Sequence, residues 1–186
     1  NRIQSLGSNL LTVSPSRQNS GGVRGESGGV TTLVLADAKA IEEKFSNTLV
    51  NKVSPEYSSR SQVVAGRNNT NVSVIGVYPS YAEVRKISMD KGLFISERDV
   101  STMAKVAVLG PTTATDLFAE NNPLGKTIKI GNQTLRVIGV TVAKGGTGFN
   151  NPDDMIYVPL TTAQRQIFGR DNLTGIAVEA KSKEVM

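Results

Sequence analysis

The sequence contains no histidine, no cysteine and no tryptophan among its 186 residues. Without histidine or cysteine there is no Ser-His-Asp triad, no thiolate nucleophile and no ordinary zinc or copper site. Carboxylate, lysine or tyrosine catalysis and an oxygen-ligand cation site remain open. Any catalytic interpretation therefore needs positive support from another motif.

Long apolar runs and aromatic residues are also scarce. The longest apolar stretch, about residues 72–78, is interrupted by Ser73 and Gly76 and is shorter than the roughly 18 residues that a membrane-spanning helix needs. Aromatic residues make up 5% of the chain, and the 21 Lys and Arg, against 16 Asp and Glu, are scattered as singles and pairs. We therefore expect no membrane span within these residues and no nucleic-acid partner.

The length allows one domain or two small ones, with a core that needs no disulfides. Asn1 stands where a complete protein would have an initiator methionine, and residues 181–185 begin a helix-like pattern just before Met186. We therefore expect a domain cut from a longer protein, with any membrane helices or enzyme domain outside it.

Periodicity predicts a mixture of strands and helices in the first 90 residues. The predicted strands are residues 6–13, 31–35, 50–53, 61–65 and 72–77, and the predicted helices are residues 36–45 and 80–87. Ser54-Pro55 is expected to end one strand, residues 66–71 to form a polar hairpin tip, and Ser80 to cap a helix. The glycine- and serine-rich stretch 16–29 is expected to be a loop.

A compact α/β unit is predicted from about Gly92 onward. Its predicted strands are residues 105–109, 127–130, 133–140, 155–158 and 173–180, and its predicted helices are residues 111–120 and 161–167. Pro111 suits the first turn of a helix, and Gly131-Asn132 is typical of a two-residue hairpin turn. Thr161 or Thr162 is expected to cap the last helix.

The glycine-rich loop 144–154 holds the candidate partner-binding residues, which are Gly145, Gly146, Phe149, Asp153 and Asp154. The Phe149 ring either tucks under the loop or projects as an anchor for a partner. Asp153-Asp154 offers oxygen ligands for calcium but lacks the alternate spacing and the bidentate glutamate of an EF-hand. Hydrogen bonds from backbone N–H groups to these carboxylates are therefore favoured over a metal.

Two other motifs suggest catalysis but lack its context. Residues 125–127 read Gly-Lys-Thr, yet Glu120 occupies the place of the first glycine of a phosphate-binding loop. Ser88 and Lys91 have Ser-x-x-Lys spacing but precede a glycine turn. A hydrolase that uses Ser88 and Lys91, or the aspartate pair described above, is the least favoured hypothesis.

The order of eight short segments resembles the extracytoplasmic domain of MacB-type ABC transporter permeases over nearly the whole chain. The segments are residues 3–13, 53–55, 91–94, 106–110, 117–118, 123–128, 137–140 and 156–164. They include Leu-Gly-Ser-Asn-Leu-Leu-Thr-Val over 6–13, Pro-Leu-Gly-Lys-Thr-Ile over 123–128 and Ile-Tyr-Val-Pro-Leu-Thr-Thr-Ala-Gln over 156–164.

The resemblance implies an α+β fold with two lobes, placed between the first two membrane helices of a permease. Residues 1–90 and 170–186 would form a porter-like subdomain that contains a βαβ unit and both chain ends. Residues 91–169 would form a smaller inserted α/β lobe. The domain would lie on the extracytoplasmic side of the cell membrane.

The resemblance also implies a domain without an active site or cofactor. It would couple cytoplasmic ATP hydrolysis to export by changing conformation and by docking an adaptor protein or the substrate. Its partners would be a membrane-fusion adaptor, an ABC ATPase reached through the membrane helices, and a second permease copy. The alternative is a module that captures a lipid, peptide or lipoprotein directly, which a cavity between the two lobes would favour.

Overall fold

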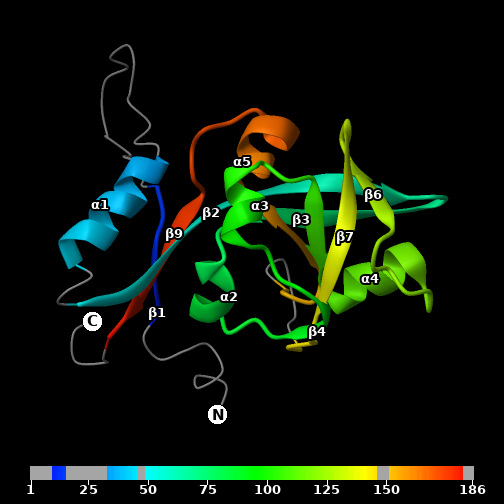
Figure 1. Cartoon of the computed structure of the whole chain (residues 1–186), viewed down its shortest axis with the longest axis horizontal. Coiled ribbons are helices and arrows are strands. Elements are labelled where there is room, and N and C mark those ends of the chain that lie inside the picture. The colour runs from blue at the N-terminus through cyan, green and yellow to red at the C-terminus, as the bar shows by residue number, and fades with distance from the viewer. Residues whose placement is uncertain (1–9, 16–32, 46–48, 146–150, 182–186) are drawn as a thin grey trace, which may run out of the picture.

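The computed structural model describes residues 10–15, 33–45, 49–145 and 151–181, which form one twisted sheet with helices on it (Figure 1). The strand order is β1-β9-β2-β3-β8-β5-β7-β4, and β6 pairs with β2 and β7. The strands are β1 (Leu10–Val13), β2 (Val50–Ala65), β3 (Asn68–Val77), β4 (Met89–Gly92), β5 (Val106–Leu109), β6 (Thr127–Ile130), β7 (Gln133–Thr141), β8 (Met155–Pro159) and β9 (Gly175–Ala180). The helices are α1 (Leu35–Phe45), α2 (Ser80–Val84), α3 (Glu97–Ser101), α4 (Pro111–Phe118), α5 (Leu160–Thr162) and the π-helical turn η2 (Ala163–Phe168). This mixture of helices and strands confirms the predicted α+β class.

Both predicted hairpins are present. Gly131 has a φ of 56° in the turn between β6 and β7, as the Gly-Asn signal predicted. The β2–β3 hairpin has a shorter tip than predicted, since Ala65 already pairs with Asn68 and Gly66 takes the positive φ. The polar residues 68–71 therefore belong to β3.

The predicted end of a strand at Ser54-Pro55 is wrong, because β2 runs through both residues. The Glu56 carbonyl accepts the Thr174 N–H beside β9, so strand alternation turns Pro55 to the opposite side. On that side β3 begins to pair with β2 only at Glu56. The missing N–H of Pro55 therefore leaves no ladder position empty.

The predicted strand over 31–35 is wrong at its described end. Leu33 makes an isolated bridge to Leu173, and Leu35 already begins α1. The Asp37 carboxylate accepts the Val34 N–H at 2.8 Å, which fixes the chain at the start of the helix. The amphipathic helix itself and the proline-led α4 are confirmed.

The predicted threonine and serine caps are wrong, because these hydroxyls bond elsewhere. Ser80 donates to the Val53 carbonyl at 3.0 Å, and Pro79 occupies the N-cap of α2. Thr161 and Thr162 donate to the carbonyls of Val100 and Ala104 at 2.5 and 2.9 Å. Each of these hydroxyls therefore ties its helix to a neighbouring element.

Apolar side chains cover both faces of the central strands. In β3, β5 and β8, alternate residues enter two separate clusters. The larger cluster packs beneath α1, α4 and α5, and the smaller one includes Tyr81 of α2 and Val100 of α3. A sheet buried on both faces explains why these strands are almost continuously apolar.

The sheet continues across the predicted boundary between the two lobes, since β3 pairs in parallel with β8. The two-lobe division stays a prediction. The expected meeting of the chain ends is visible in β1 and β9, which pair from Leu10 opposite Glu179 to Val13 opposite Ile176. None of the described helices is long and apolar enough to cross a membrane.

Candidate functional site

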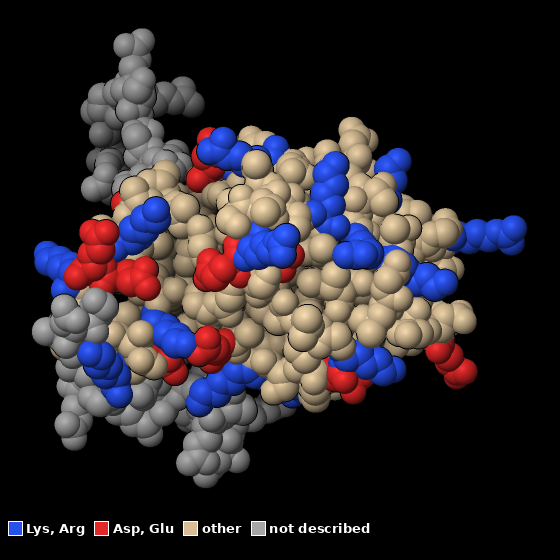
Figure 2. Space-filling view, viewed as in Figure 1, with Lys and Arg blue, Asp and Glu red and all other residues tan. Residues whose placement is uncertain are grey.

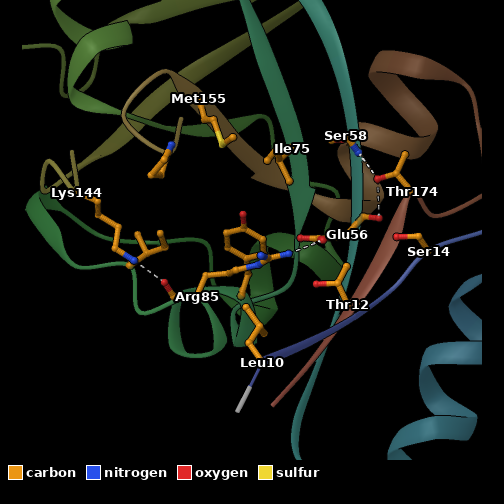
Figure 3. A pocket seen from close by; sticks show the side chains of 13 residues that line it. Leu10, Thr12, Ser14, Glu56, Ser58, Ile75, Arg85, Lys144, Met155 and Thr174 are labelled. Carbon is orange, nitrogen blue, oxygen red and sulfur yellow. Dashed lines mark hydrogen bonds and ion pairs between the residues drawn. The ribbon is translucent and has the colours of Figure 1, made fainter. Parts of the chain in front are cut away.

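A cavity of about 430 Å³ opens where β1, β2, β3 and the residues after α2 meet the segments that precede and follow residues 146–150 (Figure 3). Its polar lining includes Thr12, Glu56, Ser58, Arg85, Lys144 and Thr174. Its apolar lining includes Leu10, Ile75, Ile87 and Met155. The cavity therefore joins residues from both of the predicted lobes.

A half-buried ion pair stands in this cavity. Nη2 of Arg85 donates to Oε1 of Glu56 at 2.8 Å, and the two side chains are 28% and 13% exposed. The guanidinium carbon lies 5.7 Å from the centroid of the Tyr81 ring, within cation–π range. Burial raises the pKa of Glu56 above its usual value of 4.5, and this effect outweighs the attraction of Arg85, which lowers it.

Lys144 brings a second cation to the cavity wall. Its Nζ donates to the backbone carbonyl of Arg85 at 2.6 Å. Burial and the positive charges of Lys86 and Arg85 lower the pKa of Lys144, while Asp153 partly opposes the shift. Arg85, Lys86 and Lys144 thus lie close together, with Glu56 and Asp153 as the nearby negative charges.

The carboxylate of Asp153 holds the start of the glycine-rich loop. It accepts the N–H groups of Lys144 and Gly145 at 2.7 and 2.8 Å. The backbone N–H of Asp153 donates to the side-chain oxygen of Asn151. Asp154 accepts the Thr113 hydroxyl at 3.2 Å. The bonds to Asp153 confirm the predicted hydrogen bonds from backbone N–H groups, whereas the Asp154 carboxylate accepts a side-chain hydroxyl instead. Among the described residues no acidic cluster suited to a metal occurs.

Gly145, Asp153 and Asp154 thus lie beside the cavity, whereas Gly146 and Phe149 fall outside the described residues. The partner-binding role of all five stays a prediction. Sequence reasoning missed Glu56 and Arg85, which are 29 positions apart and are brought together only by the packing of α2 on β2. No motif links them.

The catalytic alternatives gain no support from the described part of the chain. Ser88 and Lys91 form no hydrogen bond with each other there, and the Ser88 carbonyl instead accepts the N–H of Val142. Gly125 lies in a turn that leads into β6, not at the start of a helix. A phosphate-binding loop requires that helix.

The entire chain, residues 1–186, matches the family model of the MacB-like periplasmic core domain. The chain belongs to this family. It is 38% identical over 180 residues to the macrolide export ATP-binding/permease protein MacB of Bdellovibrio bacteriovorus, covering 97% of the chain and 27% of that protein. It is 37% identical over 183 residues to the MacB of Chlorobaculum tepidum, covering 98% of the chain and 28% of that protein.

The fold is also shared with solved MacB-type domains. The periplasmic region of MacB from Actinobacillus actinomycetemcomitans superposes with a TM-score of 0.77 at 24% identity, covering 97% of this chain and 78% of that one. The extracellular domain of the noncanonic ABC-type transporter YknZ from Gram-positive bacteria gives a TM-score of 0.71 at 20% identity, covering 82% of this chain and 75% of that one. At these identities the two structures support the fold alone.

This MacB-like domain is therefore the extracytoplasmic part of an ABC-type transporter permease, as the resemblance predicted. It spans little more than a quarter of the curated relatives, at 27% and 28% of their lengths. On the face shown in Figure 2, acidic and basic side chains are interspersed near α1, while those over β6 and β7 are mostly basic. The exposed Lys129 and Arg136 belong to these two strands.

Proposed function

We propose that this domain couples cytoplasmic ATP hydrolysis to export and does no chemistry itself. It would pass a conformational change in the membrane helices to an adaptor protein or to the exported substrate. The curated relatives are named macrolide export ATP-binding/permease proteins, which supports a role in export driven by ATP. The ATPase would belong to another part of the transporter.

The course of β2 is the observation that carries this proposal. At its start β2 pairs with β9, beside the ends of the described chain, and at its end it pairs with β3 and β6. One strand of 16 residues thus joins the chain ends to the opposite end of the domain (Figure 1). A displacement at the β1–β9 edge would be passed to the distal hairpins, because β2 is paired with β9 near its start and with β3 and β6 near its end.

The pairing of β1 with β9 suits insertion between two membrane helices. Leu10 and Glu179 are direct partners, so the chain enters and leaves the sheet side by side. Paired residues of antiparallel strands have Cα atoms about 4.5–5.5 Å apart. Two helices that continue from these strands would enter the bilayer as neighbours and would move the sheet together.

The partners in this proposal are a membrane-fusion adaptor and a second permease copy. The loop with Gly145, Gly146, Phe149, Asp153 and Asp154 is the proposed contact. Its anchor is Asp153, because the carboxylate fixes the N–H groups of Lys144 and Gly145 and so sets the direction in which the loop leaves the sheet.

The proposal is tested by replacing residues 10–180 of the full-length transporter with a short Gly-Ser linker. The β1–β9 pairing lets this linker span the gap without moving the flanking segments. We expect basal ATP hydrolysis to persist and ATP-driven export to be lost. A matched control inserts the same linker at the exposed Gly66-Arg67 turn, which leaves the described sheet intact and should preserve both activities.

Two results would contradict the coupling role. Export that survives removal of the domain would show that the domain is dispensable for transport. Loss of basal ATP hydrolysis together with export, in a variant that reaches the membrane in normal amounts, would show that the domain is part of the ATPase machinery.

A further inference from the structure

We propose that the cavity around Arg85 binds an amphipathic anion, a molecule with one carboxylate or phosphate group on an apolar chain. This inference goes beyond the coupling role and does not depend on it. It narrows the idea of an extracytoplasmic ligand-binding module to one place and one chemical class.

The sign of the ligand's charge follows from the charges that line the cavity. Arg85 and Lys144 are cationic and Glu56 is the anionic residue of the lining. Asp153 adds a nearby negative charge and Lys86 a nearby positive one, since both act on the pKa of Lys144. The three cations therefore outnumber the two carboxylates, and an anion gains more than a cation from entering.

The guanidinium of Arg85 has donors to spare. Within the described part of the chain its one acceptor is Oε1 of Glu56. Its Nε–H also lacks an acceptor but is buried, so a ligand would meet the Nη groups. An arginine offers five N–H donors in a planar fork that matches a carboxylate or phosphate. The Tyr81 ring lies against this fork and helps to fix its plane, so the group is prepared for such a partner.

Lys144 is placed to assist the same anion. Its Nζ reaches the Arg85 carbonyl at 2.6 Å and so lies next to the residue that carries the guanidinium (Figure 3). An ammonium has three donors, and this bond uses one of them. A negative headgroup between the two cations would also offset the repulsion from Lys86 and Arg85, which adds to the effect of burial in lowering the pKa of Lys144.

The apolar part of the lining supplies the second half of the recognition. Leu10, Ile75, Ile87 and Met155 come from four separate segments and border the same space as the cations. The volume of about 430 Å³ falls within the range of roughly 300–1,000 Å³ for small-molecule sites. A headgroup alone would leave this apolar wall in contact with water, so a ligand with a tail fits better.

A cationic ligand fits the site less well. Its partner would have to be Glu56, whose Oε1 is engaged by Arg85. The amine would also have to approach Arg85 and Lys144, both of which repel it. The Thr174 hydroxyl carries no charge to attract a cation, and it already donates to the Glu56 carbonyl and accepts the Ser58 N–H.

Calorimetric titration of the 186-residue chain tests the proposal with four probes of known composition. Dodecanoate and dodecyl phosphate combine the two features, dodecanol lacks the charge, and inorganic phosphate lacks the tail. We expect one or both anionic amphiphiles to bind at least about tenfold more tightly than either partial probe, because charged hydrogen bonds and burial of an apolar tail are each worth at least about that much. Comparing dodecanoate with dodecyl phosphate then assigns the headgroup.

Point variants locate the binding. Arg85→Met should weaken the better amphiphile by about tenfold, while the control Arg136→Met removes the same charge from the exposed face of β7 and should leave affinity unchanged. Because Arg85→Met leaves Glu56 buried without its partner, the double variant Glu56→Gln with Arg85→Met provides a neutral pair if the single variant does not fold.

Three results would overturn the site. Dodecanol binding as tightly as the anions would show an uncharged apolar pocket, and inorganic phosphate binding as tightly would show that the tail is irrelevant. Equal loss in the Arg85 and Arg136 variants would show non-specific attraction to a basic protein. None of these results bears on export by the full-length transporter, so this inference and the coupling role can fail separately.

Discussion

Arg85 and Glu56 form an ion pair of 2.8 Å between the end of α2 and the middle of β2. Glu56 is also the position at which β2 pairs with Gly175 of β9 on one side and with Val77 of β3 on the other. The ion pair therefore fastens α2 to the point where the two halves of the sheet join. A change at this ion pair would therefore affect the packing of both β3 and β9.

The pH dependence of stability should carry the signature of Glu56. Its raised pKa means that the folded state holds the proton more tightly than the unfolded state does, so unfolding becomes easier as the pH rises. We expect the free energy of unfolding to fall as the pH increases from 4.5 through the folded-state pKa. Urea unfolding of Glu56→Gln across this range should lack that component, whereas Glu43→Gln on α1 should retain it.

Asp153 should matter more for stability than its neighbour Asp154. Asp153→Ala removes the acceptor of two backbone N–H groups and should cost about 1–3 kcal/mol in the free energy of unfolding. Asp154→Ala removes one bond to the Thr113 hydroxyl and should cost less than about 1 kcal/mol. Equal losses in chemical denaturation would show that the loop anchor is misassigned.

Gly76 of β3 lies closely against the helical residues Leu160 and Ala163 that follow β8. A Cβ at Gly76 would lie 2.5 Å from Cβ of Ala163 and 3.2 Å from Leu160. Gly76→Ala should therefore destabilise the domain by about 1–3 kcal/mol. Adding Ala163→Gly removes the clashing atom and should recover part of the loss, and a double variant that is less stable than Gly76→Ala would contradict this packing.

The hairpins and the proline-led helix could be predicted from the sequence because their signals are local. Gly131-Asn132 and Gly110-Pro111 each specify a backbone geometry within two residues. α3 was missed although Ser96 and Asp99 form a full capping box. The capping pattern was available in the sequence. α2 has the same length of five residues and was predicted, but over the longer range 80–87.

The candidate site was less predictable because tertiary packing makes it. The continuity of β2 through Pro55 depends on which side β3 starts to pair, and the ion pair depends on α2 lying over β2. Residues 144, 145 and 151–154 lie outside the strands, as predicted, and the backbone hydrogen bonds to Asp153 were expected. The cavity is lined by Lys144 together with Leu10 and Glu56, so it forms only when three distant segments meet.

Phe149 should serve coupling rather than stability if it projects toward a partner. In the full-length transporter, Phe149→Ala should lower adaptor-stimulated ATP hydrolysis while leaving the melting temperature of the domain unchanged. Phe118→Ala is the matched control, because Phe118 packs against the larger cluster and each 1 kcal/mol lost there lowers the melting temperature by about 2–4 °C. A large fall for Phe149→Ala would show that its ring is part of the core.

The natural absence of cysteine allows motion of the domain to be measured directly. Spin labels at Arg67→Cys in the distal turn and Lys44→Cys in α1 would be placed in a full-length transporter whose other cysteines have been replaced. Double electron–electron resonance should show an unchanged distance between positions 44 and 67 within one copy. The distance between position 67 of one copy and position 67 of its paired copy should shift when ATP is added. An unchanged distance between copies, in a transporter that still exports, would contradict the coupling role.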